Sequence, residues 1–349
     1  HEQMNFYKII FSISLLLLLG KNNAYAENVP PCKKWDGAID SDGMQLCPET
    51  ESDWALMRCA WHQGKTFNAP TAKQKQLTRS LVASLIEGDV SSTLEIAPKL
   101  HLRFCRVKKY DKDKKLIDQY LVGATVPGYN AYNGAFFLHR ETKDTIPVLG
   151  QNPHMGTDNV TNETFANTKI AAWIVNGQYK GVATEKVSCE DRKISDAAHS
   201  VKHGFYDAHK AYTTLRPDLA VIQLHGMKGD GMLITNGLRR NAGKNSLMYA
   251  FTKIVAEKFP NNPKFRACAE GTLLPESQKC NLQQAWVEAK DLTCASSVQC
   301  GTGSTNLDRF IGVEQNVNIA SNPRIMSDII NKLEKEWFAR SNPIKTCLR

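Results

Sequence analysis

VLGQNPHMGTD (residues 148–158) and AVIQLHGM (residues 220–227) are the two stretches that decide the fold of this chain. Each is a short apolar run followed closely by a histidine near a glycine, His154 in the first stretch and His225 in the second. A short apolar run bounded by turn residues is typical of a buried strand. We therefore expect two buried strands that each deliver an imidazole to the edge of a sheet.

Expected strands and helices alternate around these two stretches. The apolar patterns predict strands at residues 100–108, 116–122, 134–138, 145–150, 220–224, 232–235 and 309–314, of which 134–138 and 145–150 look like a pair. They predict helices at residues 70–87, 163–173, 196–215, 246–258 and 323–339. This order predicts an α/β fold in which a mixed, largely parallel sheet is sandwiched by helices and carries disulfide-stapled inserts. In such folds, sites form at the carboxyl ends of the strands.

The N-terminal part of the chain has the pattern of a secretory signal peptide. Lys8 precedes an apolar run at residues 9–19, and an Ala-x-Ala cleavage motif ends at Ala26. The apolar run is short for a bilayer span, so an uncleaved anchor is the weaker alternative. The remainder has no second long apolar stretch, so we expect an exported protein, periplasmic or secreted, without membrane contact. Residues 27–110 are expected to form a disulfide-tied segment packed on a catalytic domain at residues 111–349, with a cysteine-rich insert at 259–304.

The ten cysteines all follow the expected cleavage point. An even number of cysteines in an exported protein predicts disulfides. The sequence contains no C-x-x-C pair, which argues against a cysteine-based zinc site. We expect Cys268, Cys280, Cys294 and Cys300 to pair among themselves within the insert.

The formal net charge is +9 at pH 7. It favours anionic surroundings such as a cell wall or an anionic polymer, although a solvated basic surface has the same composition. Aromatic residues are not interleaved with lysine and arginine along any long stretch, so the pattern is not that of a nucleic-acid-binding protein.

Five of the nine histidines lie between residues 154 and 225. A catalytic zinc takes about three protein ligands and keeps one open position, and neutral imidazole is its commonest ligand. His154 and Asp158 are four residues apart, where one helical turn would bring both side chains to one side, and His225 comes from a distant strand end. These three residues are the expected zinc ligands. The alternative for any single histidine is a hydrogen-bonded structural group at a strand end.

The remaining chemistry needs a carboxylate that moves a proton, and Glu314 at the end of an expected strand is the candidate. His199 lies near the start of an expected helix. It could be a metal ligand, a group that supports a ligand or binds substrate, or a helix residue with no part in catalysis; we favour the second role. Arg239 and Arg240 could hold a substrate carboxylate by a bidentate pair, or form an exposed basic turn. His203 and His209 are expected at the surface. A serine hydrolase is disfavoured because no G-x-S-x-G motif occurs.

The order PHMGTD, DAAHS, IQLHGM and FIGVEQN resembles zinc carboxypeptidase-like and N-formylglutamate amidohydrolase-like enzymes, including secreted poly-γ-glutamate hydrolases. The resemblance covers roughly residues 120–340. It implies that His154, Asp158 and His225 bind zinc and that Glu314 is the general base and acid. Those carboxypeptidases usually carry His-x-x-Glu, so Glu163 is the second candidate for the carboxylate ligand.

The sequence thus predicts an exported zinc-dependent hydrolase that cleaves an amide bond in a peptide or amino-acid-derived polymer by metal-activated water. The same metal site could serve an esterase. The alternative from a different class is a non-catalytic protein that binds a wall or an anionic polymer.

Overall fold

The computed structural model describes residues 38–47, 67–126, 136–142, 144–154, 158–186, 193–226, 231–236, 243–262, 264–267, 309–316 and 322–339. The expected signal peptide, the four cysteines of the expected insert, and Arg239 and Arg240 lie outside these ranges. The backbone of Asp158 is described but its side chain is not.

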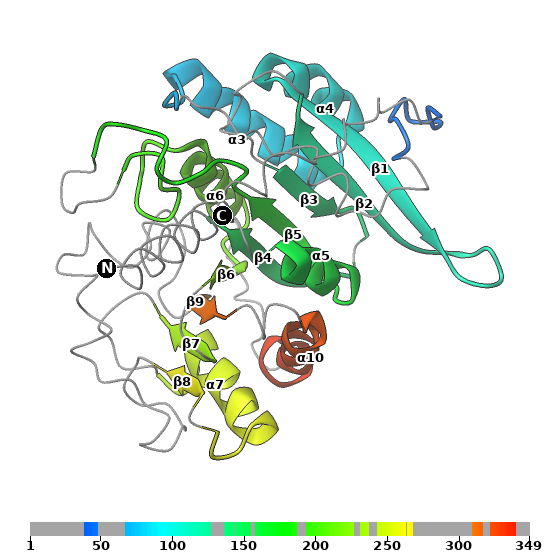
Figure 1. The fold of residues 1–349 in the computed structure, drawn as a ribbon. Helices are drawn as coiled ribbons and strands as arrows, with labels where there is room; N and C mark the ends of the chain where they lie inside the picture. Colours follow the sequence, from blue (N-terminus) through cyan, green and yellow to red (C-terminus); the bar gives the residue numbers. More distant parts are fainter. Residues whose placement is uncertain are drawn as a thin grey trace, which may run out of the picture. The chain divides into compact units, whose positions relative to one another are not determined.

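A nine-stranded mixed sheet forms the centre of this part of the chain, in the order β1-β2-β3-β5-β4-β6-β9-β7-β8 (Figure 1). Its strands are β1 (Leu102–Tyr110), β2 (Leu116–Thr125), β3 (Phe136–Arg140), β4 (Ile146–Asn152), β5 (Ile170–Val175), β6 (Ala220–Gly226), β7 (Met232–Thr235), β8 (Phe265–Ala267) and β9 (Phe310–Gln315). The four central strands β5, β4, β6 and β9 are parallel to one another. The α/β class and the mixed sheet are confirmed.

Parallel pairs do not predominate over the whole sheet, although its four central strands are all parallel. Parallel pairing joins β4 to β5, β4 to β6, β6 to β9 and β7 to β8, whereas the other four neighbouring pairs are antiparallel. A tight turn at residues 111–115 joins β1 to β2, and such a turn allows only antiparallel neighbours. The expected boundary between residues 110 and 111 separates β1 from β2. Because these two strands pair in one sheet, residues 102–110 belong to the same sheet as the expected catalytic domain.

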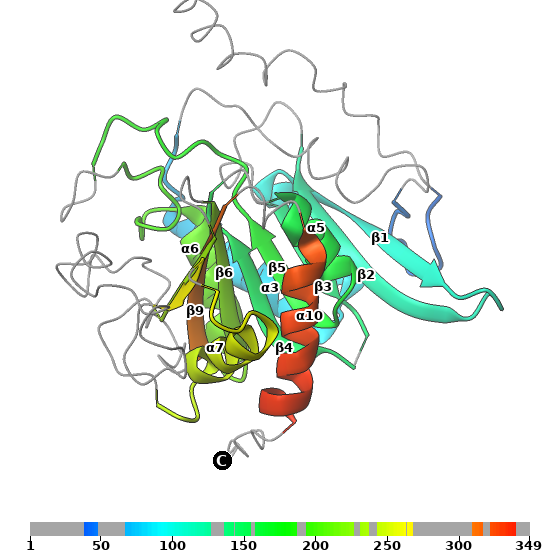
Figure 2. The ribbon, with the colours of Figure 1, turned by 60° about the horizontal axis from the view of Figure 1, so that its bottom comes forward.

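Helices cover both faces of the sheet (Figure 2). One apolar core lies under α3 (Ala72–Glu87), α4 (Val90–Ile96), the 3-10 turn η1 (Ala97–Leu100) and α6 (Gly204–Leu215). The other lies under α5 (Asp158–Ala166), α7 (Leu247–Lys258), α10 (Pro323–Leu333) and its continuation η6 (Glu334–Phe338). Residues along each strand alternate between the two cores, as in Val221, Ile222 and Leu224 of β6. No helix of the described residues is long and apolar enough to cross a bilayer.

The local sequence explains where α3 begins and ends. Thr71 accepts a hydrogen bond from the backbone of Gln74, whose side chain accepts one from the backbone of Thr71, and this capping box starts the helix. Gly88 ends it with φ 72°, a left-handed conformation that glycine adopts without strain. Leu81 and Leu85 are buried and belong to the apolar core under this helix.

Two expected elements differ from the structure. The helix expected at residues 163–173 is wrong, because α5 ends at Ala166 and the following IAAWIV is the buried strand β5. A strand with both faces buried is apolar throughout, and periodicity alone does not separate it from a buried helix. β5 also lies between β3 and β4, which were expected to pair with each other.

The helix expected at residues 196–215 begins only at Gly204, because residues 196–203 form turns. The side chain of Asp196 accepts a hydrogen bond from the backbone of Ala198, which favours a turn over a helix. His203 then caps α6, since its Nδ1 accepts the backbone N–H of Phe205.

A short segment before α3 lies along the outer edge of β1. The backbone N–H of Cys47 donates to the carbonyl of Arg106, and the N–H of Arg106 donates to the carbonyl of Gln45. A disulfide joins Cys47 to Cys105, and the other cysteines lie outside the described residues. Arg106 is 2% exposed, forms a bidentate pair with Glu141 at 2.9 Å, and also pairs with Asp40. The disulfide and these ion pairs fasten the segment to the sheet.

Candidate functional site

The register of three central strands places polar side chains on one face of the sheet. Gln151 of β4 lies beside Gln223 of β6, and His225 of β6 lies beside Glu314 of β9. Side chains two residues apart on a strand share a face, so Gln223 and His225 both lie on the face covered by α6. His154 follows the end of β4 by two residues.

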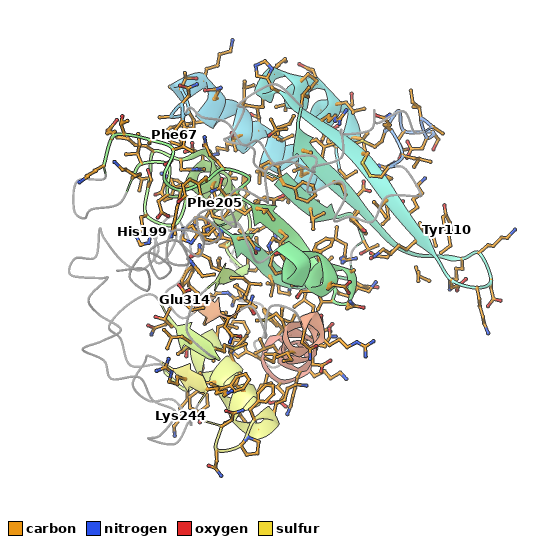
Figure 3. The ribbon with its side chains drawn as sticks, viewed as in Figure 1. Phe67, Tyr110, His199, Phe205, Lys244 and Glu314 are labelled. Carbon is orange, nitrogen blue, oxygen red and sulfur yellow. A yellow bond between two sulfur atoms is a disulfide. The ribbon has the colours of Figure 1, made fainter. Side chains whose placement is uncertain are left out.

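Three of the residues expected at the site come together at these strand ends. Nδ1 of His154 lies 3.3 Å from Nδ1 of His225, with the two rings nearly perpendicular. Oε1 of Glu314, at the end of β9 (Figure 3), lies 3.6 Å from Nδ1 of His225. The Glu314 side chain is 31% exposed and the imidazole of His225 only 8%, so the carboxylate lies at the solvent side of the histidine pair.

Hydrogen bonds on the far side of each ring determine which nitrogen carries a proton. Nε2 of His154 lies 2.7 Å from Oδ1 of the buried Asp196, and Nε2 of His225 lies 2.7 Å from Oε1 of Gln223. Carboxylate and amide oxygens only accept hydrogen bonds, so each Nε2 carries a hydrogen and donates it. A neutral ring whose hydrogen is on Nε2 presents the lone pair of its Nδ1 to the other ring.

Two lone pairs at this separation repel each other unless a proton or a metal ion lies between them. Two imidazole nitrogens bound to one tetrahedral zinc, at about 2.0–2.1 Å each, are about 3.3 Å apart. A carboxylate that accepts from the far nitrogen of a metal-bound histidine is also the usual support of such a ligand. The donor chemistry and the spacing of His154 and His225 therefore fit two ligands of a zinc ion.

The rest of a ligand set is not present among the described side chains. No group of three or more His, Cys, Asp or Glu in the described ranges is arranged to hold a metal. The side chain of Asp158, the expected third ligand, lies outside them. Glu163, the second candidate, is exposed on α5 and accepts a hydrogen bond from Asn167.

The site is electrostatically suited to neutral imidazoles. Burial, together with the positive charges that His154 and His199 can carry, holds the pKa of His225 well below its usual range. Burial also lowers the pKa of His203 to about 3. A neutral imidazole is the form that binds a metal, so no proton has to be removed from His225 near neutral pH.

The three other histidines of this stretch lie in positions the sequence did not predict. His199 lies in the turns before α6 and not at a helix start; it is buried and close enough to affect the pKa of His225. His203 and His209, expected at the surface, are fully buried. His203 packs against Phe67 while it caps α6, and Nδ1 of His209 is hydrogen-bonded to the side chain of Gln151 at 2.8 Å.

Sequence reasoning missed Asp196, Gln151 and Gln223. Asp196 opens the DAAHS stretch and lies within the helix expected at residues 196–215, although an aspartate there also fits a turn. The two glutamines interrupt apolar strands, and a polar residue in a strand that is buried on both faces is a signal for a hydrogen-bonded group.

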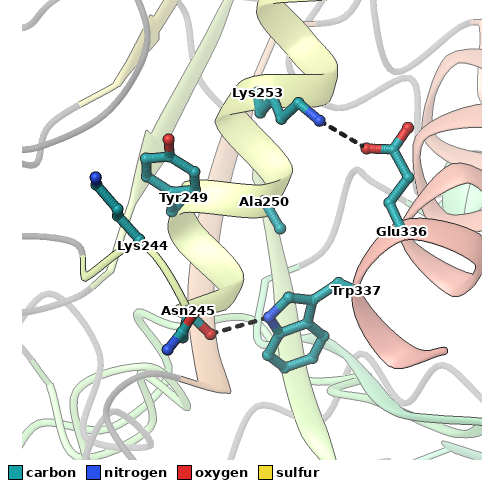
Figure 4. Close-up of a pocket in the computed structure, with 7 residues that line it drawn as sticks. All are labelled: Lys244, Asn245, Tyr249, Ala250, Lys253, Glu336 and Trp337. Carbon is teal, nitrogen blue, oxygen red and sulfur yellow. Dashed lines mark hydrogen bonds and ion pairs between the residues drawn. The ribbon is translucent and has the colours of Figure 1, made fainter. Parts of the chain in front are cut away.

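A separate hollow of about 460 Å³ lies between the start of α7 and η6. Figure 4 shows Lys253 bonded to Glu336 and the indole of Trp337 donating to the carbonyl of Asn245. None of the clustered histidines lines this hollow, so it is distinct from the site at the strand ends.

Comparisons with known proteins do not identify the chain. No family model matches the sequence, and no curated protein matches it. Among solved structures, esterase Est22 is similar over 57% of this chain and 53% of its own length, with 14% identity and a TM-score of 0.17. A substituted form of Est22 is similar over 54% of this chain and 53% of its own length, with 13% identity and a TM-score of 0.16. The similarity thus spans about half of either chain, and its TM-score is too low to bear on fold or activity.

Proposed function

We propose that this chain is a zinc-dependent hydrolase that cleaves an amide bond in a peptide or amino-acid-derived polymer. The observation that carries the proposal is the pair of facing Nδ1 atoms at 3.3 Å, each held as a lone-pair donor by a hydrogen bond at Nε2. The resemblance of the sequence motifs to zinc carboxypeptidase-like enzymes supports it independently, because it selects the same two histidines.

His154 and His225 would hold the zinc ion, and the resemblance adds Asp158 as the third ligand. When bound, the ion lowers the pKa of a water molecule to about 7 and polarises the substrate carbonyl. The histidine pair lies at the carboxyl ends of parallel strands, where substrates reach sites of α/β proteins.

Glu314 would move the proton. Its carboxylate is 3.6 Å from Nδ1 of His225 and remains partly exposed, so it can contact both water and substrate. It accepts a proton from the attacking water as the new C–O bond forms at the carbonyl carbon. It then gives that proton to the leaving nitrogen as the C–N bond breaks. In the same proposal, Arg239 or Arg240 orients a carboxylate of an anionic substrate, which the net positive charge of the chain also favours.

The test combines metal content with hydrolysis of amide substrates. We expect about one zinc per chain in protein purified without chelator, loss of the metal in His225→Ala, and retention of the metal in Glu314→Gln. The Glu314→Gln variant should lose about 10²–10⁴-fold in rate because only proton transfer is removed.

His101→Asn is the matched control. His101 is exposed and adopts φ 51°, which asparagine tolerates, and it is remote in sequence from the histidine pair. This variant should keep both zinc and activity. Wild-type protein that binds no zinc would reject the proposal in favour of a non-catalytic binding protein. Zinc-dependent hydrolysis of esters but not amides would identify the esterase alternative.

A further inference from the structure

A chain of buried hydrogen bonds leads from His225 into the interior of the protein. Nε2 of His225 is 2.7 Å from Oε1 of Gln223, Nε2 of Gln223 is 2.9 Å from Oε1 of Gln151, and Nε2 of Gln151 is 2.8 Å from Nδ1 of His209. Gln151, Gln223 and His209 are each 0% exposed. The four side chains come from β4, β6 and α6, and they connect the strand ends to the helix that covers this face.

The chain of bonds has a direction. His225 donates to the first amide, that amide donates to the second, and the second donates to the lone pair on Nδ1 of His209. Each amide offers one oxygen and one NH₂ group, so no link can be reversed unless both amides turn over and both histidines exchange their protonated nitrogens. Hydrogen bonds in such a chain polarise and strengthen one another.

These glutamines are costly residues for central strands. Burying an amide without partners costs free energy, and an apolar side chain would fill the same space with no such requirement. The strand register places Gln151 directly beside Gln223, so the two amides satisfy each other, and the ends of the chain are occupied by the two histidines. The arrangement therefore couples the proton position of His225 to that of His209 in addition to filling the core.

We infer that Gln223, Gln151 and His209 form a relay that positions His225 with its hydrogen on Nε2, and so holds Nδ1 as a lone-pair donor toward His154. The three relay side chains are positioning residues. They support His225 as Asp196 supports His154. The role of the relay in metal binding rests on the proposed function, whereas its control of the His225 tautomer does not.

The first experiment measures zinc affinity by competition with a chromogenic chelator. Gln223→Met removes the acceptor beside Nε2 and should weaken zinc binding about 10–100-fold. Gln151→Met leaves that acceptor in place and removes only its support, so the loss should be smaller. Gln223→Glu keeps an acceptor beside Nε2 of His225 but loses the donor to Gln151, so its affinity should lie between those of Gln223→Met and the wild type. Thr252→Val removes a buried, hydrogen-bonded hydroxyl on α7, away from the relay. It is the control and should bind zinc as the wild type does.

The second experiment reads the tautomer directly in metal-free protein, from the ring ¹⁵N chemical shifts of His225. Wild type should show the Nε2-protonated form, and Gln223→Met should show a mixture of both forms. If Gln223→Met binds zinc as tightly as the wild type and keeps one tautomer, the relay inference is wrong while the proposed function stands. If the wild type binds no zinc, the proposed function is wrong, and so is the role of the relay in metal binding. The ¹⁵N shifts then still decide whether the relay sets the tautomer of His225.

Discussion

Replacing Gly150 by alanine should destabilise the protein through one identifiable clash. Gly150 lies on β4, immediately before Gln151, and the indole of Trp173 on the neighbouring strand β5 covers its α-carbon. A β-carbon added at Gly150 would lie 2.2 Å from Cδ2 and Cε3 of Trp173. Ordinary van der Waals contact begins near 3.4 Å, so the ring or the strand would have to move by more than 1 Å.

Trp173 has little freedom to make that movement. It is fully buried, and its indole N–H donates to Oδ1 of Asn152 at 3.0 Å. Forcing an extra carbon into a packed core costs about 1–3 kcal/mol, and we expect Gly150→Ala to fall at the upper end of this range. Because β4 also carries Gln151 and leads to His154, zinc affinity should fall with stability.

The measurement is urea denaturation, followed by circular dichroism. Gly243→Ala is the matched control, because no atom of the described residues lies within 4 Å of a β-carbon at Gly243. It should change the free energy of unfolding by less than about 0.5 kcal/mol. In a Trp173→Leu background, adding Gly150→Ala should cost much less than in wild type, since the ring that it meets is gone. If Gly150→Ala is as neutral as Gly243→Ala, the close approach of the indole is not what requires glycine at this position.

Three further predictions concern the other supports of the fold and the site. Asp196→Ala removes the acceptor beside Nε2 of His154 and should weaken zinc binding about 10–100-fold in a chelator competition assay, whereas an unchanged affinity would mean that Asp196 does not support the ligand. Burial lowers the pKa of His139 to about 4, below the value of about 6.5 in the unfolded chain, so the unfolded state binds a proton first as the pH falls. The free energy of unfolding should therefore fall by about 3 kcal/mol in total as the pH is lowered from about 6.5 to about 4. In urea titrations across this pH range, the free energy of unfolding should fall less for His139→Gln than for the wild type. Removing the Cys47–Cys105 disulfide, with 58 residues of sequence separation, should lower the free energy of unfolding by about 4 kcal/mol on the chain-entropy account, and equal melting temperatures for oxidised and reduced protein would contradict this.

The parts of the site that the sequence predicted are those with a local signature. A short apolar run followed by a histidine specifies both the strand and the position of the side chain at its end, so His154 and His225 could be placed together. Glu314 followed from the same reasoning, because it ends an apolar run that becomes β9. Parallel neighbours then bring residues separated by tens of positions to a common edge.

The parts that the sequence did not predict depend on tertiary contacts. Whether IAAWIV forms a strand or a helix is decided by the strands on either side of it, and no local pattern carries that information. The burial of His203 and His209 follows from the packing of α6 on the sheet, since histidine is common both inside and outside proteins. Asp196 could be assigned to His154 only once the turns at residues 196–203 were known.

The segment that the Cys47–Cys105 disulfide fastens to β1 also bears on how copies of the protein behave toward one another. β1 is the outermost strand on its side of the sheet, and an open strand edge is a template for pairing with another chain. The backbone of residues 45–47 occupies part of that edge, and the neighbouring Lys108 and Lys109 add charge that opposes the approach of a second strand. Under reducing conditions this cover would be held by hydrogen bonds, ion pairs and the packing of Met44 in the core. The protein should then become prone to edge-to-edge aggregation before its core unfolds, so the disulfide protects solubility as well as stability.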